Sequence, residues 1–540
     1  MSHTLQTDIV RVAEGRLRGA VTADGAVRAF KGIPYARAPM GERRWRPPEP
    51  ADRWDGVREA TAYGAVCPQP VLPEASLYFA GREPQSEDCL FLNVWTAAGR
   101  GDRRPVMVWL HMGAFLFGSG SARVSGADGA ASMSLYDGEG LARAGAVVVT
   151  LNHRLGRLGF LAHPALSAES PHGGSGNYGL LDQIAALEWV RDNIAAFGGD
   201  PARVTLFGLS AGSYSVSHLM TSPLARGLFH RAIGQSGAAF GPTKPSCGVN
   251  DAMQDLASAE RTGLEVAAAL GAASVAGLRA RSPEEIMSAP LPREPGRWAM
   301  DLSPVPYRRG DFDSGYPIVD GHVLPANVFD VFARGDQMDV PLITGSVANE
   351  SSGVPGLPSL QDYVDDSRAE YGDMADAFLE LYPASDDREA FAASAASNGD
   401  RIFVWQNWTW ARLHSRTARS PVFAYHWSRV PPIPAGAAVC ERDPRAFHSS
   451  EVPYVFRHLH VRDWDWDARD HALSEAISGY WLRFAETGDP NDGERPAWPS
   501  FGGPAPAVMH FGDAAAPGPV PRRDRLDFWD AWYERWRTGG

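Results

Sequence analysis

A glycine-flanked serine that directly follows a short apolar stretch constrains the fold of this chain most. The stretch 204–209 reads Val-Thr-Leu-Phe-Gly-Leu and leads into Ser210, with Gly208 and Gly212 on either side. This G-x-S-x-G pattern is typical of a tight turn between a strand and a helix, with the serine hydroxyl exposed at its tip. Glycines flank the serine because neighbouring backbone comes very close there. The pattern predicts a strand–turn–helix unit that presents Ser210 as a nucleophile for acyl transfer.

The segment upstream of Ser210 supplies the context that such a turn requires. In a chain with 56 glycines, the G-x-S-x-G spacing alone is weak evidence. The glycine pair at 198–199 and the following Pro201 predict the end of a helix. That helix is indicated by apolar residues at helical spacing, namely Leu180, Ile184, Leu187, Val190 and Ile194.

Other short runs are apolar without any alternation of polar residues, at 106–110, 146–151, 341–344 and 422–425. Strands of this kind are buried on both faces, as in a parallel sheet flanked by helices. Strands that alternate with helices indicate the α/β class. We therefore predict a central, mostly parallel sheet of the doubly wound type, with helices on its faces.

The remaining segments are consistent with one domain over residues 1–540. Short β-like runs with glycines over 8–30 predict N-terminal β-hairpins. Residues 240–316 and 355–415 are predicted to be insertions that shape a gorge over the active site, and 526–536 to be a terminal helix. Four tryptophans either roof that gorge or pack in the helical layer, and we favour packing: Trp298, Trp405, Trp408 and Trp410.

The charge balance and the chain ends narrow the class of partner. The net charge is −13, and an acidic surface repels phosphate backbones, so we expect no nucleic-acid partner. No apolar run approaches the about 20 residues that span a bilayer, so we expect no membrane partner. The first residues lack the blocks of a secretory signal, which predicts a cytoplasmic protein, with secretion left open. The sequence leaves both a monomer and a homodimer open.

A serine hydroxyl becomes a nucleophile only with a base and a carboxylate that orients the base. Where the serine lies on a turn of this kind, the acid and then the histidine follow it along the chain. Glu350 lies just past the run 341–344, at the end of a sheet where α/β sites form. Its competitor Asp320 sits in an Asp-Gly pair that is more typical of a turn. Spacing alone does not choose the base among His218, His230, His322, His414, His426, His448, His458, His460, His471 and His510.

The oxyanion of a tetrahedral intermediate needs two or three N–H donors. The N–H of Ala211 is one candidate, because it directly follows the serine in the turn. The loop 111–115 is the second, because it directly follows the predicted strand 106–110 and contains small residues that let its backbone face a substrate.

Several motifs in the same order resemble the type-B carboxylesterase family of α/β hydrolases. The resemblance covers nearly the whole chain and lies in segments 30–36, 86–94, 152–156, 176–212, 235–237 and 488–491. It implies the α/β-hydrolase fold, with Ser210 as nucleophile, Glu350 as acid, His448 as base, and Gly113, Ala114 and Ala211 as oxyanion donors.

The resemblance also assigns supporting roles. It implies a disulfide between Cys67 and Cys89, whose presence would indicate oxidising surroundings, and an ion pair between Glu87 and Arg154. It makes Ser236 a partner of the acid. It implies neither a metal nor an organic cofactor, and the four cysteines form no CxxC pair.

The chain departs from the family pattern close to the site. Leu209 replaces the usual glutamate before the nucleophile, which makes the gorge less anionic and disfavours cationic choline esters. Met112 replaces the first glycine of the oxyanion loop, where it is strained if its φ is positive and otherwise narrows the pocket. Ser351 and Ser449 replace glycines after the acid and the base, while Glu451 keeps the H-x-x-E spacing.

These observations predict a serine carboxylesterase that hydrolyses neutral, small-molecule esters through an acyl-enzyme. One alternative is an acyltransferase or lactone-forming enzyme that uses the same acyl-enzyme. A second is a non-catalytic, neuroligin-like scaffold, which the presence of all three triad residues disfavours.

Overall fold

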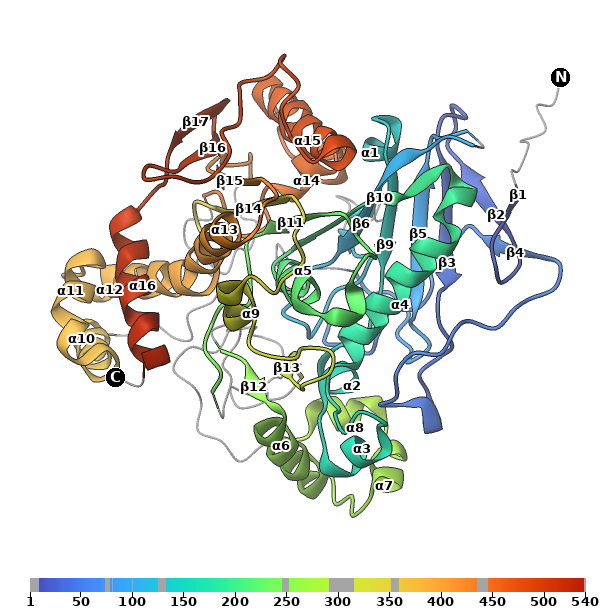
Figure 1. The fold of residues 1–540 in the computed structure, drawn as a ribbon, viewed down its shortest axis with the longest axis horizontal. Helices are drawn as coiled ribbons and strands as arrows, with labels where there is room; N and C mark the ends of the chain where they lie inside the picture. Colours follow the sequence, from blue (N-terminus) through green and yellow to red (C-terminus); the bar gives the residue numbers. More distant parts are fainter. Residues whose placement is uncertain are drawn as a thin grey trace.

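A sheet of 13 strands runs through the centre of the molecule (Figure 1). The structure is a computed structural model that describes residues 9–72, 78–79, 81–99, 101–124, 133–244, 252–290, 315–350, 359–434 and 445–538. The strand order is β1-β2-β3-β5-β9-β6-β10-β11-β14-β15-β16-β17, and β4 pairs with β2.

The middle of the sheet, from β9 to β16, is parallel. Its strands are β9 (Val147–Leu151), β6 (Arg104–Leu110), β10 (Gly199–Leu209), β11 (Arg231–Gln235), β14 (Leu342–Val347), β15 (Val422–Trp427) and β16 (Ala507–Phe511). All four apolar runs of the sequence lie in this part, so the predicted parallel sheet is confirmed.

The outer strands of the sheet pair antiparallel, except β4, which runs parallel to β2. At one edge β1 (Ile9–Arg11), β2 (Arg16–Val21) and β3 (Arg28–Pro34) form the predicted N-terminal hairpins. Next to them lie β4 (Val57–Ala60) and β5 (Phe91–Thr96), and at the other edge β17 (Ala515–Pro519) pairs with β16. Two small sheets pair β7 (Arg123–Val124) with β8 (Met133–Ser134) and β12 (Gln254–Asp255) with β13 (Ile318–Val319).

Both faces of the sheet are covered by helices, because successive side chains of a strand point to opposite faces. In β10, Val204 and Leu206 belong to one hydrophobic cluster, and Phe207 and Leu209 belong to another. The first face is covered by α4 (Tyr178–Asn193), α5 (Ala211–Thr221), α9 (Val328–Arg334) and α13 (Trp405–Thr417). The second is covered by α1 (Glu139–Arg143), α14 (Val452–Val455) and α15 (Ala468–Thr487).

Two further groups of helices extend beyond these layers (Figure 1). One contains α2 (Gly156–Phe160), α3 (Pro164–Glu169), α6 (Leu256–Ala269), α7 (Val275–Arg279) and α8 (Pro283–Ser288). The other contains α10 (Leu360–Tyr371), α11 (Ala375–Leu381), α12 (Asp387–Gly399) and α16 (Arg523–Thr538). Short 3₁₀ helices cover Gly41–Arg43, Ile194–Phe197, Pro223–Ala225, Gly372–Met374 and Leu459–Val461, and a π-helical turn covers Asp400–Val404.

The tryptophans of 405–410 pack inside the helical layer. Trp405, Trp408 and Trp410 are buried in the cluster beneath α13, as the favoured interpretation predicted. α13 contacts β14 and β15 directly, so this end of the predicted insertion 355–415 belongs to the layer on the sheet. Trp298 lies outside the described residues.

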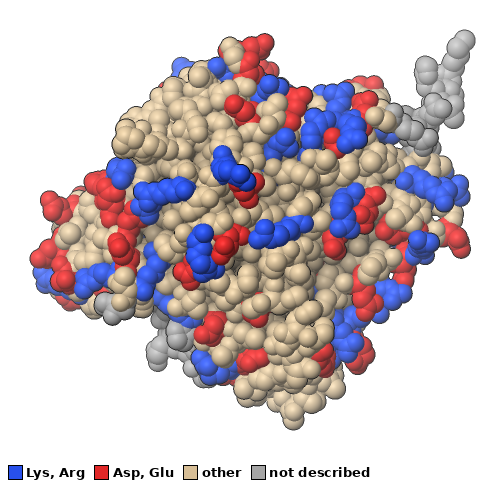
Figure 2. Space-filling view, in the orientation of Figure 1, with Lys and Arg blue, Asp and Glu red and all other residues tan. Residues whose placement is uncertain are grey.

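The charged residues do not gather in one patch on the face drawn in Figure 2, where both signs are interspersed among uncharged surface. None of the helices in the described residues combines the length and the hydropathy of a membrane-spanning segment.

Candidate active site

Ser210 occupies a strained turn between β10 and α5. Its backbone angles are φ 55° and ψ −124°, a region that residues other than glycine rarely adopt. Two hydrogen bonds hold the turn: Ser210 N donates to Gln235 O (2.9 Å), and Tyr214 N donates to Ser210 O (2.8 Å). A methyl group on Gly212 would overlap the carbonyl oxygen of Leu110, and one on Gly208 would overlap the Gly212 backbone. The flanking glycines therefore let α5 pack directly against the sheet.

His448 and Glu350 form a buried pair near the carboxyl ends of the central strands, where Ser210 also lies. His448 Nδ1 lies 2.6 Å from Glu350 Oε2, and Val347 N donates to Glu350 Oε1 (2.8 Å). Glu350 follows β14, and Asn349 N donates to Ala446 O (3.1 Å), which fixes the loop that carries the histidine. One ring nitrogen of His448 is thereby engaged by the carboxylate, and the other is left for proton transfer.

Neighbouring strands bring Ser210 and this pair to the same end of the central strands. β10 pairs with β11, and β11 pairs with β14, so the ends that carry Ser210, Ser236 and Glu350 are consecutive in the sheet. Among the described residues, no hydrogen bond joins Ser210 Oγ to His448. Catalytic hydrogen bonds of this type are often long in a free enzyme and tighten when a substrate is bound.

The loop after β6 presents free N–H groups beside Ser210. Gly113 has φ 127° and Ala114 has φ 52°, so the chain turns in the left-handed region. A methyl group on Gly113 would overlap the carbonyl oxygen of Phe117, which explains the glycine. In the described structure, the N–H groups of Gly113, Ala114 and Ala211 donate no hydrogen bond. They are available for an anionic oxygen.

Met112 is not strained, contrary to one of the two expectations. Its φ is not positive, and its buried side chain packs in the cluster that contains Trp109 and Tyr136. The left-handed turn begins one residue later, at Gly113. Leu209 is also fully buried in this second cluster.

Two residues expected beside the acid differ in their contacts. Ser236 is buried, but its hydroxyl makes no hydrogen bond within the described structure, so it is not joined to Glu350. Glu451 is fully buried and accepts hydrogen bonds from Gln235 Nε2 (3.1 Å) and Tyr425 Oη (3.4 Å). Burial raises the pKa of Glu451 to about 7.

The replacement of glycine by Ser449 has a structural consequence, because Ser449 has φ 78°. The turn after His448 thus keeps the left-handed backbone conformation that glycine favours. A serine in this conformation is strained. Ser351 lies outside the described residues.

The predicted supporting pairs are rearranged. Glu87 pairs with Arg44, at 2.5 Å between Oε2 and Nη2, and not with Arg154. Arg154 pairs with Asp182 instead, at 2.6 Å, and both side chains are buried. Arg44 lies in an irregular stretch that carries no periodic signal, so the sequence pattern could not identify it.

Cys67 and Cys89 are free, buried thiols, so the implied disulfide is not present in the structure. The two side chains nevertheless contact each other. The neighbouring Cys67 thiol, together with burial, raises the pKa of Cys89 well above its ordinary value. Cys247 and Cys440 lie outside the described residues.

Two buried histidines in and near the loop 111–115 were not predicted. The rings of His111 and His153 stack with centroids 4.8 Å apart. Burial lowers the pKa of His111 to about 3 and that of His153 to about 4, so both rings are neutral at pH 7. Their positions in the loop 111–115 and in the motif 152–156 were the only available signals.

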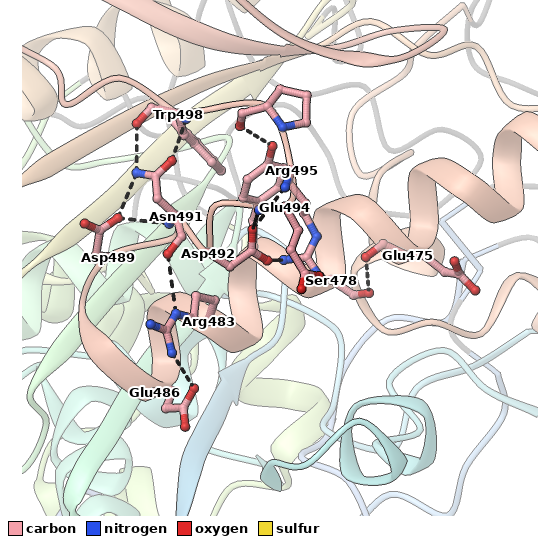
Figure 3. Close-up of polar contacts among 12 residues, drawn as sticks. Glu475, Ser478, Arg483, Glu486, Asp489, Asn491, Asp492, Glu494, Arg495 and Trp498 are labelled. Atoms are coloured by element: carbon pink, nitrogen blue, oxygen red, sulfur yellow. Dashed lines mark hydrogen bonds and ion pairs between the residues drawn. The ribbon is translucent and has the colours of Figure 1, made fainter.

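The segment 488–491 forms the loop that directly follows α15. Asp489 Oδ1 accepts hydrogen bonds from the side chain and backbone N–H of Asn491, and Asn491 in turn bonds the backbone of Trp498 (Figure 3). Next to this loop lies an open cavity of about 740 Å³, lined by arginines such as Arg104, at the first residue of β6. It is therefore at the opposite end of the strands from Ser210, and its arginines pair with neighbouring carboxylates, as Arg495 does with Asp492.

Comparison with known proteins identifies the chain. The model of the carboxylesterase family matches residues 6–529. The fumonisin B1 esterase of Sphingopyxis macrogoltabida is 36% identical over 529 residues, which are 95% of this chain and 88% of that protein. The para-nitrobenzyl esterase of Bacillus subtilis (strain 168) is 35% identical, over 91% and 92% of the two chains. A solved structure of a PNB esterase superposes with a TM-score of 0.78 at 30% identity and covers 97% of this chain and 99% of that chain.

The match extends over nearly the whole chain, and the fold is that of the α/β hydrolases. The chain belongs to the carboxylesterase family, and it is a carboxylic ester hydrolase.

Proposed function

We propose that the protein hydrolyses neutral carboxylic esters through an acyl-enzyme formed on Ser210. The observation that carries this proposal is the arrangement of polar groups at the carboxyl ends of the central strands. A strained serine turn, two sources of free N–H groups and the 2.6 Å His448–Glu350 hydrogen bond lie at the ends of neighbouring strands.

In the first half-reaction, Ser210 Oγ attacks the ester carbonyl carbon while the free ring nitrogen of His448 takes the hydroxyl proton. Glu350 holds the imidazole through Nδ1 and stabilises its positive charge. The tetrahedral intermediate collapses with cleavage of the bond to the leaving oxygen. His448 returns the proton to that oxygen, so the alcohol leaves neutral and the acyl group stays on Ser210.

In the second half-reaction, water replaces the alcohol. His448 takes a proton from the water as its oxygen attacks the acyl carbon, and then gives a proton to Ser210 Oγ as the acyl bond breaks. The carboxylic acid leaves and the free serine is restored. In both halves the backbone N–H groups of Gly113, Ala114 and Ala211 bind the oxyanion.

The residues around the nucleophile support a neutral substrate. The position before Ser210 is the apolar Leu209, which is fully buried. The neighbouring buried carboxyl, Glu451, has a pKa raised to about 7 by burial, so it is partly protonated at neutral pH. Neither group supplies the full negative charge that would attract a cation.

The test is hydrolysis of p-nitrophenyl esters, acetate through decanoate, by the wild type and two variants. We expect Ser210→Ala to lower kcat by about 10⁴- to 10⁶-fold. We expect Glu350→Gln to lower kcat by about 10²- to 10⁴-fold, because the amide can keep a hydrogen bond but cannot stabilise the imidazolium.

The matched control is Asp320→Asn. Asp320 Oδ1 accepts hydrogen bonds from the backbone of His322 and Leu324, which makes it part of a turn. It should leave kcat unchanged. Wild-type kcat in the Ser210 variant, or equal losses in the two carboxylate variants, would contradict the proposed roles.

A further inference from the structure

His218 is a buried imidazole that the proposed reaction does not use. It lies on α5, two turns beyond Ser210, and its side chain is only 2% exposed. Neither ring nitrogen has a hydrogen-bond partner in the described structure. Burial lowers its pKa to about 3, so the ring is neutral at pH 7. A neutral imidazole presents one donor and one acceptor, and both are unused.

The imidazole borders a small cavity beside the proposed site. The cavity has a volume of about 20 Å³ and is lined by Phe115, Tyr214, His218, Ala239, Met253 and Tyr316, among others. Phe115 directly follows the proposed oxyanion donor Ala114, and Tyr214 N donates to Ser210 O. The cavity is therefore built from the same loop and helix as the site.

The surroundings of His218 are otherwise aromatic or apolar. The ring of Phe115 lies 6.3 Å from the imidazole and 6.4 Å from the ring of Tyr316, measured between centroids. An unsatisfied buried polar group destabilises a folded protein, and an apolar side chain of similar shape would avoid that cost. A polar group kept at such a position is expected to meet a polar atom at some stage of the protein's work.

The size of the cavity limits what that atom can belong to. A volume of about 10–15 Å³ suffices for one water molecule, so the cavity admits a single oxygen-sized group. The lining residues other than His218 are apolar or aromatic and none of them is charged, so we expect the group that carries this oxygen to be apolar or aromatic and uncharged.

We propose that His218 is a specificity-determining residue that hydrogen-bonds one oxygen, a hydroxyl or a carbonyl, at the end of an apolar or aromatic part of the ester substrate. This proposal rests on the proposed function, because the cavity can bind part of an ester substrate only if Ser210 is the nucleophile. It names the substrate class as esters whose apolar group carries one uncharged oxygen at its far end.

The experiment compares esters that differ by that oxygen alone. The acyl pair is p-nitrophenyl phenylacetate and p-nitrophenyl 4-hydroxyphenylacetate. The alcohol pair is 2-phenylethyl acetate and 2-(4-hydroxyphenyl)ethyl acetate. In one of the two pairs, the wild type should prefer the hydroxylated ester in kcat/KM.

The key variant is His218→Phe, which keeps a ring and removes both nitrogens. We expect the preference for the hydroxylated ester to fall by about 10- to 100-fold, with kcat/KM for the unsubstituted ester within a few-fold of wild type. His218→Gln restores a donor and an acceptor and should recover part of the preference.

The matched control is His426→Phe. His426 is another histidine whose pKa is lowered to about 3 by burial, but it lies on β15 and borders a different cavity. It should leave the preference unchanged. The thermal midpoint of His218→Phe should equal or exceed that of the wild type, because two unsatisfied nitrogens are removed.

Three outcomes would overturn the proposal. One is a wild type without preference in either pair, and another is a His218→Phe enzyme that slows both members of each pair equally. The third is a large loss of thermal stability in both His218 variants, which indicates a structural role such as holding a buried water. Failure of the proposed function is distinct, since the wild type would then hydrolyse none of the four esters in a Ser210-dependent way.

Discussion

At the scale of single residues, Glu451 places a second carboxyl among the groups around His448 and Glu350. Its side chain is fully buried and bonds Gln235 and Tyr425 through Oε1, while Oε2 has no partner in the described structure. Burial raises its pKa from an ordinary 4.5 to about 7, and the nearby charge of Glu350 acts in the same direction. The folded protein therefore favours the protonated form of this acid.

This shift makes stability depend on pH in a defined direction. Between about pH 4.5 and 7 the folded state binds more protons at Glu451 than the unfolded state does, so the free energy of unfolding falls as the pH rises. Glu451→Gln does not titrate. The variant's free energy of unfolding minus that of the wild type should therefore be larger at pH 8 than at pH 4.5. We expect this difference to grow by about 3 kcal/mol between the two pH values.

Urea unfolding of both proteins at the two pH values measures this difference, and groups common to both proteins cancel in the comparison. If the wild type and the variant lose stability in parallel from pH 4.5 to 8, Glu451 does not carry a raised pKa.

At the scale of elements, the contact between α5 and β6 is closer than helix propensity alone would select. Gly212 lies in the first turn of α5, where alanine is intrinsically favoured over glycine by about 1 kcal/mol. A methyl group there would overlap the carbonyl oxygen of Leu110, at the end of β6. Backbone cannot move aside as a flexible side chain can.

We therefore expect Gly212→Ala to destabilise the protein by about 1–3 kcal/mol despite the gain in propensity. It should also lower kcat, because the displacement falls between Ser210 and the loop that carries the proposed oxyanion donors Gly113 and Ala114. Gly502→Ala is the control, since Gly502 has open space around it and no positive φ. Thermal midpoints and kcat of both variants decide the matter, and a Gly212→Ala protein as stable as wild type would show that the two elements are not in close contact.

The difference between local sequence patterns and contacts across the fold explains which elements and site residues could be predicted from the sequence. The runs at 106–110 and 341–344 are buried on both faces of the sheet, so composition alone marks them as strands. The partner of Glu87 could not be found in this way, because Arg44 reaches it through tertiary packing from an irregular stretch. The backbone conformation of Met112 could not be predicted either, because the sequence does not show that the neighbouring Gly113 takes the positive φ. Local patterns fix elements and their order, whereas contacts between distant segments depend on how the layers pack.

At the scale of the whole molecule, α16 ties the helices outside the sheet to the layer that covers it (Figure 1). Trp529 is fully buried and donates through Nε1 to Tyr382 Oη (3.0 Å). The next residue, Asp530, accepts a hydrogen bond from Trp405 Nε1 of α13 (2.8 Å). One helix thus contacts both groups, so the packing of α10–α12 depends on it.

We expect Trp529→Ala to lower the free energy of unfolding by about 3–5 kcal/mol, because it removes a large buried side chain and leaves a cavity. Trp536 lies on the same helix but is 47% exposed, so Trp536→Ala should cost less than about 1 kcal/mol. Urea unfolding of the two variants measures the difference. Because α16 does not carry any proposed catalytic group, kcat of the folded Trp529→Ala protein should stay near the wild-type value at 25 °C. A marked fall in kcat with little loss of stability would mean that α16 acts on the site itself and not through the packing of the outer helices.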